Sequence, residues 1–233
     1  GRVYGGGNEG NVGGNTTVTV RAGDLNKVYG GARMADVGGR AFVNVDGAHA
    51  SDYMLINYVY GGNDISGTIS ATDTTVPEEL TEVIKDGMTD EQKKGKNEID
   101  NTWNTFVRVS TKTETVDGKV RETDDAKKIY IGQLFGGGNG NYTYDSETDG
   151  NVVTHILKDA ETGSEILRTA ADIHQPGLGK TYLEILGGSI VNAFGGGNMA
   201  TVTDDVVIHL DNPSKVVNHI KVKDGIEDDV NDD

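Results

Sequence analysis

The sequence contains no cysteine and only three prolines in 233 residues. Without cysteine, the chain can form neither a disulfide framework nor a thiolate site. The scarcity of proline, together with glycines that do not fall at every third position, excludes collagen. Long apolar runs are also missing, because no stretch approaches the roughly 18 residues that span a bilayer. We therefore expect no membrane-embedded segment.

Basic residues are few compared with acidic ones. The chain has 21 Lys and Arg against 37 Asp and Glu, a formal net charge of −16. Nucleic acid binding needs a basic surface that neutralises phosphates, so this charge argues against a nucleic acid partner. The chain opens with Gly1-Arg2-Val3-Tyr4, without a signal peptide, and we interpret it as one domain, residues 1–233, of a longer protein.

Glycine, in contrast, is abundant, with 34 residues beside a hydrophobic fraction of only 35%. Glycine costs about 1 kcal/mol in a helix interior, so this composition favours short strands and tight turns over helices. An aromatic residue followed by glycines occurs five times: Tyr4-Gly5-Gly6, Tyr29-Gly30-Gly31, Tyr60-Gly61-Gly62, Phe135-Gly136-Gly137 and Phe194-Gly195-Gly196.

This signature belongs to a longer repeat. The first two aromatic residues are 29 − 4 = 25 residues apart, and the same offset aligns Val18 with Val43 and Val20 with Val45. Each unit contains alternating, β-rich segments such as 16–20 and predicts about three short strands joined at glycine-rich corners. A single unit cannot bury its apolar side, so the units must stack. The sequence therefore predicts an all-β solenoid of about 25 residues per coil.

Stacking in register places identical positions on top of each other. It predicts a ladder of the signature aromatics and an amide ladder of Asn8, Asn139 and Asn198. Val28 and Tyr29 are adjacent, so in a straight strand only one of them would face the core, and alternation alone does not tell which.

Two departures from the spacing predict large insertions, at about 71–104 and 141–179. Both lie between the same two aligned positions of consecutive units, so we expect both to leave one side of the stack and contact each other. The segments 77–84 and 90–103 have helical spacing, whereas 152–157 and 166–167 predict a β-hairpin. A smaller insertion after Val109 predicts a hairpin turn at 116–119, and the acidic run 227–233 predicts a cap or a frayed tail.

No group of residues predicts a catalytic, metal or cofactor site. The segment 145–150 resembles the first half of an EF-hand loop, but Ile156 stands where the bidentate Glu is needed, so we interpret it as a solvated acidic turn. The histidines have no metal-ligand spacing: His49, His155, His174, His209 and His219. Trp103, Tyr142 and Tyr144 form a candidate carbohydrate-stacking platform if the insertions meet.

Positions pointing outward near the valine pairs are mixed in chemistry and contain no repeated carboxylate pair for acid–base work. They are Thr17, Thr19, Arg21, Asn44, Asp46, Arg108, Glu184 and His209.

The recurring Val-Tyr-Gly-Gly-Gly-Asn unit, followed by Thr-x-Val-x-Val, resembles the right-handed parallel β-helix repeats of large surface proteins from gut Bacteroidetes. Those proteins are similar to autotransporter passenger domains and filamentous adhesins. The resemblance implies a cell-surface or secreted, non-catalytic adhesin-like or structural module that displays its inserted loops to a glycan or a protein partner. The alternative is a polysaccharide lyase or glycoside hydrolase of the β-helix type.

Overall fold

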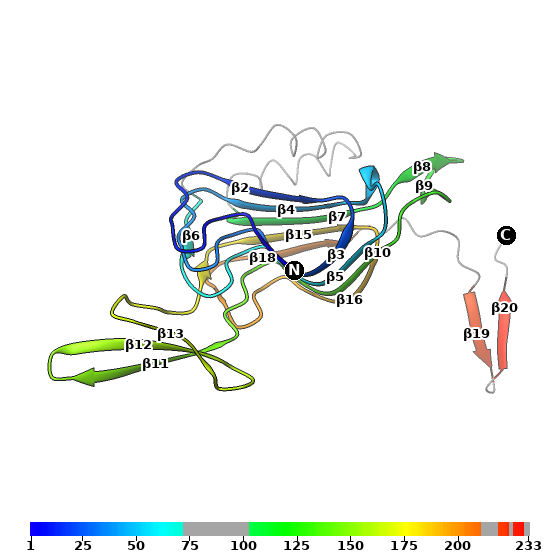
Figure 1. Ribbon diagram of the computed structural model, residues 1–233. Coiled ribbons are helices and arrows are strands. Elements are labelled where there is room, and N and C mark those ends of the chain that lie inside the picture. The colour runs from blue at the N-terminus through cyan, green and yellow to red at the C-terminus, as the bar shows by residue number, and fades with distance from the viewer. Residues whose placement is uncertain (72–102, 211–218, 224–225, 231–233) are drawn as a thin grey trace.

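The computed structural model describes residues 1–71, 103–210, 219–223 and 226–230 (Figure 1). These residues form an all-β protein, as expected, with one short 3-10 helix, η1 (Gly47–His49), and no α-helix among them. The helical segments predicted in the first insertion lie outside the described residues, apart from Trp103 at its end.

One parallel sheet collects the strand that ends at the aromatic signature of each unit. Its order is β1-β3-β5-β10-β16. The strands are β1 (Arg2–Tyr4), β3 (Gly23–Tyr29), β5 (Met54–Tyr60), β10 (Ile129–Phe135) and β16 (Ser189–Phe194). Tyr4 pairs with Tyr29, Tyr29 with Tyr60, and Phe135 with both Tyr60 and Phe194. The register read from the repeat is therefore confirmed in this signature sheet.

A second parallel sheet collects the valine-rich strands, in the order β18-β15-β7-β4-β2. They are β2 (Thr16–Val20), β4 (Ala41–Asp46), β7 (Thr105–Ser110), β15 (Thr181–Leu186) and β18 (Val206–Leu210). Val18 pairs with Val43, as the 25-residue offset predicts. The two sheets have the same unit order because each unit adds one strand to each of them.

Short strands form a third parallel row. Within its unit each of them lies, along the chain, between the signature strand and the valine-rich strand. The row contains β6 (Thr68–Ile69), β14 (Gly177–Leu178) and β17 (Thr201–Val202), in the order β17-β14-β6. Isolated bridges from Ile69 to Val37 and from Val37 to Val12 continue the row through the first two units. The expectation of three short strands is thus confirmed in the last three units, whereas the first two units contribute one bridge residue each to this row.

The core between the two large sheets is aliphatic, because every second residue of each strand points inward. Val43, Val107, Ile56 and Leu134 in this cluster have no exposed surface. Burial of each such side chain stabilises the fold by about 1.5–3 kcal/mol.

The signature aromatics lie on the opposite side of the signature sheet from this core. Val28 belongs to the aliphatic cluster and Tyr29 to a separate aromatic cluster, and both have no exposed surface. Successive rings stack with centroids 4.8 to 5.0 Å apart from Tyr4 through to Phe194. The predicted aromatic ladder is confirmed. Val28 faces the aliphatic core and Tyr29 faces the aromatic cluster, so both residues are buried because both faces of the strand are covered.

The predicted amide ladder is only partly present. Asn198 Nδ2 donates to Asn139 Oδ1 at 3.2 Å, as stacking requires. Asn8 is not part of that pair, since its Oδ1 accepts a hydrogen bond from Arg33 Nη1 at 3.0 Å.

The second insertion forms a three-stranded antiparallel sheet, which we call the inserted sheet: β11 (Tyr142–Asp149), β12 (Val152–Asp159) and β13 (Glu165–Thr169). The hairpin predicted around 152–167 is β12–β13, and β11 adds a third strand. A second hairpin, β8 (Thr113–Val116) and β9 (Lys119–Glu122), turns at Asp117 and Gly118, both with positive φ, as expected for a type I′ turn. The inserted sheet and this hairpin project from opposite ends of the stacked strands (Figure 1).

The two large insertions leave the stack at different corners, contrary to expectation, and their expected contact with each other involves residues outside the described ranges. The second insertion precedes β14, whereas the first follows β6, and these two strands are paired neighbours in the third row. The insertions therefore start from opposite ends of equivalent strands. Spacing between aligned positions gives only the total added length, so it cannot locate the corner at which residues were added. Farther along the chain, β19 (His219–Lys223) and β20 (Ile226–Val230) pair antiparallel, and β20 includes part of the acidic run.

Candidate functional site

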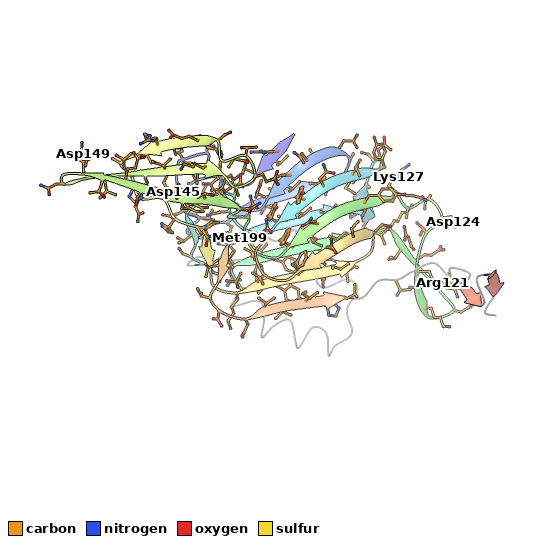
Figure 2. The ribbon with its side chains drawn as sticks, turned by 90° about the horizontal axis from the view of Figure 1, so that it is seen from below. Arg121, Asp124, Lys127, Asp145, Asp149 and Met199 are labelled. Atoms are coloured by element: carbon orange, nitrogen blue, oxygen red, sulfur yellow. The ribbon has the colours of Figure 1, made fainter. Side chains whose placement is uncertain are left out.

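The inserted sheet is fixed to the corner that follows β5. The Tyr142 hydroxyl donates to Asp64 Oδ1 at 2.9 Å, and the Tyr144 hydroxyl donates to the backbone oxygen of Ile65. Ile65 and Leu157 are buried together in one apolar cluster. These contacts hold the base of the inserted sheet in place, while its far end projects into solvent with Asp145 and Asp149 along it (Figure 2).

Asp64 is the centre of this attachment and has no exposed surface. Its carboxylate also accepts hydrogen bonds from the Tyr4 hydroxyl at 2.8 Å and from Asn139 Nδ2 at 2.8 Å. A buried carboxylate is costly unless it is hydrogen-bonded, and here three neutral side chains donate to it. Burial, followed by the charge of Asp64, raises the pKa of Tyr4 to about 12 and also raises that of Tyr142.

A cavity of about 260 Å³ lies between the inserted sheet and the stacked units. The stacked units line it with Arg2, Lys27, Arg33, Ile65 and Asn139. The insertion lines it with Asn141, Tyr142, Asp159, Ala160, Glu161 and Ile166. The cavity depends on both parts of the protein, and the Asp64 network that joins them keeps it preformed.

Three cations gather on the stacked-unit side of this cavity. Arg2 and Lys27 are partners in adjacent strands β1 and β3, so their side chains leave the same face of the sheet. The Lys27 amine lies 5.2 Å from the centre of the Tyr58 ring, and burial lowers its pKa despite the opposing charge of Asp64. Arg33 reaches the cavity from the corner after β3.

Acidic groups lie on the opposite wall. Asp159 Oδ1 accepts hydrogen bonds from the backbone of Glu161 and from both the backbone and the hydroxyl of Thr162, so it holds the turn between β12 and β13. Glu161 is exposed at that turn. The cavity is thus polar on both sides, with Ile65 and Ile166 as its aliphatic surfaces.

The candidate carbohydrate platform is not assembled. Trp103 is buried and packs against Phe42 and Phe106 outside the second sheet. Tyr142 and Tyr144 belong to another cluster, at the base of the inserted sheet. The three rings were grouped on the expectation that both insertions meet, but the tryptophan and the two tyrosines lie in separate clusters.

The acidic segment 145–150 is a strand end and turn with ion pairs, not a solvated turn alone. Asp145 contacts the amine of Lys158 at 2.6 Å, and Glu147 contacts Arg168 at 2.7 Å. Among the described residues, no group of three or more His, Asp or Glu side chains is arranged to hold a metal ion.

The histidines lie apart from one another. His49 Nδ1 is 3.0 Å from Asp46 Oδ1, and His155 Nδ1 is 3.7 Å from Asp172 Oδ1. His174 and His209 lie on a loop and on β18, and the side chain of His219 is outside the described part of the chain.

Three of the outward positions of the second sheet, Asn44, Arg108 and Glu184, lie in one row on neighbouring strands. Thr19 and His209 continue this row at its two ends. The three central residues are buried rather than open to solvent. Arg108 Nε lies 3.4 Å from Glu184 Oε2, and Arg21 pairs with Asp46 at 2.9 Å. The row brings one carboxylate next to a cation, which is not the pair of carboxylates that glycosidic hydrolysis uses.

Sequence reasoning missed Asp64, Arg2, Lys27 and Arg33. One signal was present: Arg2 and Lys27 are 25 residues apart, so the repeat itself makes them cross-strand neighbours. Asp64 also stands out, since Gly-Gly-Asn-Asp in the third unit replaces the Gly-Gly-Gly-Asn of the first, fourth and fifth units.

Comparisons with protein-family models, with curated proteins and with solved structures gave no match. No family is therefore assigned. Within the described ranges, no helix has the length and apolar character of a membrane span.

Proposed function

We propose that this protein is a non-catalytic binding module in which stacked repeat units, wound as a right-handed parallel β-helix, present the inserted sheet to a glycan. The parallel pairing of equivalent strands at the repeat offset supports this architecture. A right-handed connection is the usual path between parallel strands of one sheet. This architecture, together with the resemblance to adhesin-like surface proteins, favours a cell-surface or secreted location.

The observation that carries the binding proposal is the preformed polar cavity between the inserted sheet and the stacked units. Glycan sites combine hydrogen-bonding groups with small apolar surfaces, and both are present in its lining. The buried Asp64 network fixes Tyr142 and Asn139 before any ligand arrives, which lowers the entropic cost of binding.

A glycan array, followed by a turnover assay on the glycans that bind, tests this function. We expect binding without formation of shorter or unsaturated products. Product formation would instead establish the polysaccharide lyase or hydrolase alternative, and the absence of any binding would leave a structural role.

A matched pair of variants tests the location. Ala160 lines the cavity at an exposed turn, so A160W should fill the cavity and abolish glycan binding. Thr148 is exposed on the same inserted sheet, near its far end, so T148W should bind as the unchanged protein does. Equal binding by both variants would place the site elsewhere.

A further inference from the structure

The cavity between the inserted sheet and the stacked units has an unusual charge for this protein. Three cations and two carboxylates line it, a net of one positive charge, whereas the whole chain carries −16. A basic cluster in an acidic chain is not explained by average composition.

The three cations also make no ion pair with any carboxylate of the described residues. Several other described cations do form such pairs, as Arg21 pairs with Asp46 and Lys158 with Asp145, whereas the described cations on and directly after the exposed strand β9 do not. No ion pair within the described residues involves Arg2, Lys27 or Arg33.

Arg2 and Lys27 are moreover direct cross-strand neighbours, and like charges in that position destabilise a sheet. Asp64 lies near both and offsets part of their charge, but its oxygens already accept hydrogen bonds from Tyr4, Asn139 and Tyr142. Across the cavity, Asp159 Oδ1 accepts the hydrogen bonds of the turn that it stabilises, and Asp159 and Glu161 act on Lys27 through their charge rather than through an ion-pair contact. Within the described residues the three cations therefore keep hydrogen-bond donors that no carboxylate uses, and an anion from outside can accept from them.

We propose that the cavity binds an anionic sugar residue, with its carboxylate or sulfate against Arg2, Lys27 and Arg33. This inference rests on the glycan-binding function proposed above and specifies its ligand. Guanidinium groups bind carboxylate and sulfate oxygens through charge-assisted hydrogen bonds. The remaining polar groups, Asn141 and Glu161, face the ring hydroxyls.

The size and the aliphatic walls favour a sugar over a bare anion. A volume of about 260 Å³ is just below the usual range of small-molecule pockets, so it suits a single ring rather than a long chain segment. Ile65 and Ile166 contribute apolar surface that an inorganic anion would not use. The bound unit is therefore a terminal or branching hexuronate or sulfated hexose.

Calorimetric titration of the full chain with four probes tests this ligand: glucuronic acid, glucose 6-sulfate, glucose and inorganic sulfate. We expect one or both anionic sugars to bind at least about tenfold more tightly than glucose and inorganic sulfate, with affinity falling as salt is raised. The two anionic sugars distinguish carboxylate from sulfate recognition.

Charge-removing variants locate the anion. K27Q and R33Q should each weaken binding of the anionic sugar about tenfold, the range expected for one charged hydrogen bond. K119Q removes the same charge from the exposed strand β9 and should leave the affinity unchanged. Thermal melts of all three variants check that the fold is retained.

The outcomes separate the inference from the proposed function. If glucose binds as tightly as the anionic sugars, or if K27Q and R33Q match K119Q, the anionic ligand is wrong although glycan binding stands. If inorganic sulfate binds as tightly as the anionic sugars, the sugar ring is not recognised and the inference fails. If no glycan binds in the array either, the proposed function fails with it.

Discussion

The glycines of the aromatic signatures allow a stability prediction whose control variant lies at the equivalent position of another unit. Gly137 and Gly196 occupy the same place in the signatures of the fourth and fifth units. A Cβ on Gly137 would lie 2.8 Å from Gly197 N and 3.1 Å from Gly196 C, whereas a Cβ on Gly196 would have no atom within 4 Å. The difference arises because the fifth unit lies above the fourth, and nothing described lies above the fifth.

The expected cost of G137A follows from this contact. Backbone atoms cannot rotate away as a side chain can, so the corner must open and weaken the hydrogen bond from Gly137 N to Gly196 O, which is 3.0 Å long. Overpacking of this kind costs about 1–3 kcal/mol. Replacing glycine by alanine also stabilises by about 0.4–1 kcal/mol through the unfolded chain, a gain that both variants share.

We therefore expect G196A to be as stable as the unchanged protein or slightly more so, and G137A to be about 1–3 kcal/mol less stable than G196A. Urea unfolding followed by the fluorescence of the single tryptophan, the buried Trp103, measures both free energies of unfolding. If both variants were as stable as the unchanged protein or more so, the close stacking of the fourth and fifth units would be refuted. Equal losses in both would show that the outer face of the fifth unit is covered.

Three further outcomes follow from the attachment of the inserted sheet and from the corners. D64N should lose about 1–3 kcal/mol of unfolding free energy, because buried donors face an amide in place of a carboxylate, while D172N, at an exposed carboxylate, should change little in the same denaturation assay. The Tyr4 phenol, with its pKa raised to about 12, should stabilise the fold fully below the unfolded value of about 10 and lose that contribution as pH rises through 12. Ultraviolet titration of tyrosinate, with Y4F as the reference, measures this change. T105V removes a buried hydroxyl donor and should cost about 1 kcal/mol, whereas T19V at an exposed position should be neutral by thermal melting.

Much of the strand arrangement could be predicted from the repeat alone. The pairing of Tyr4 with Tyr29 and of Val18 with Val43 follows from one offset, because stacked identical units bury the same positions against one another. The hairpin turn at Asp117 and Gly118 was also predictable, since its residues tolerate positive φ.

The candidate site was not predictable in the same way. Asp64 meets Tyr142 across 78 residues of sequence, and no local pattern specifies such a contact. The platform of Trp103 with Tyr142 and Tyr144 failed for the same reason, since it depended on where the insertions leave the stack.

The sequence by itself determined the all-β class, the 25-residue register and the stacked aromatic ladder, since periodic burial and backbone pairing are local consequences of a repeated pattern. Only the tertiary structure decided which corner carries the inserted sheet, that Asp64 becomes its buried anchor, and that Arg2, Lys27 and Arg33 face one cavity. Insertions obey no period, so their placement depends on contacts between distant residues that form only when the chain is folded.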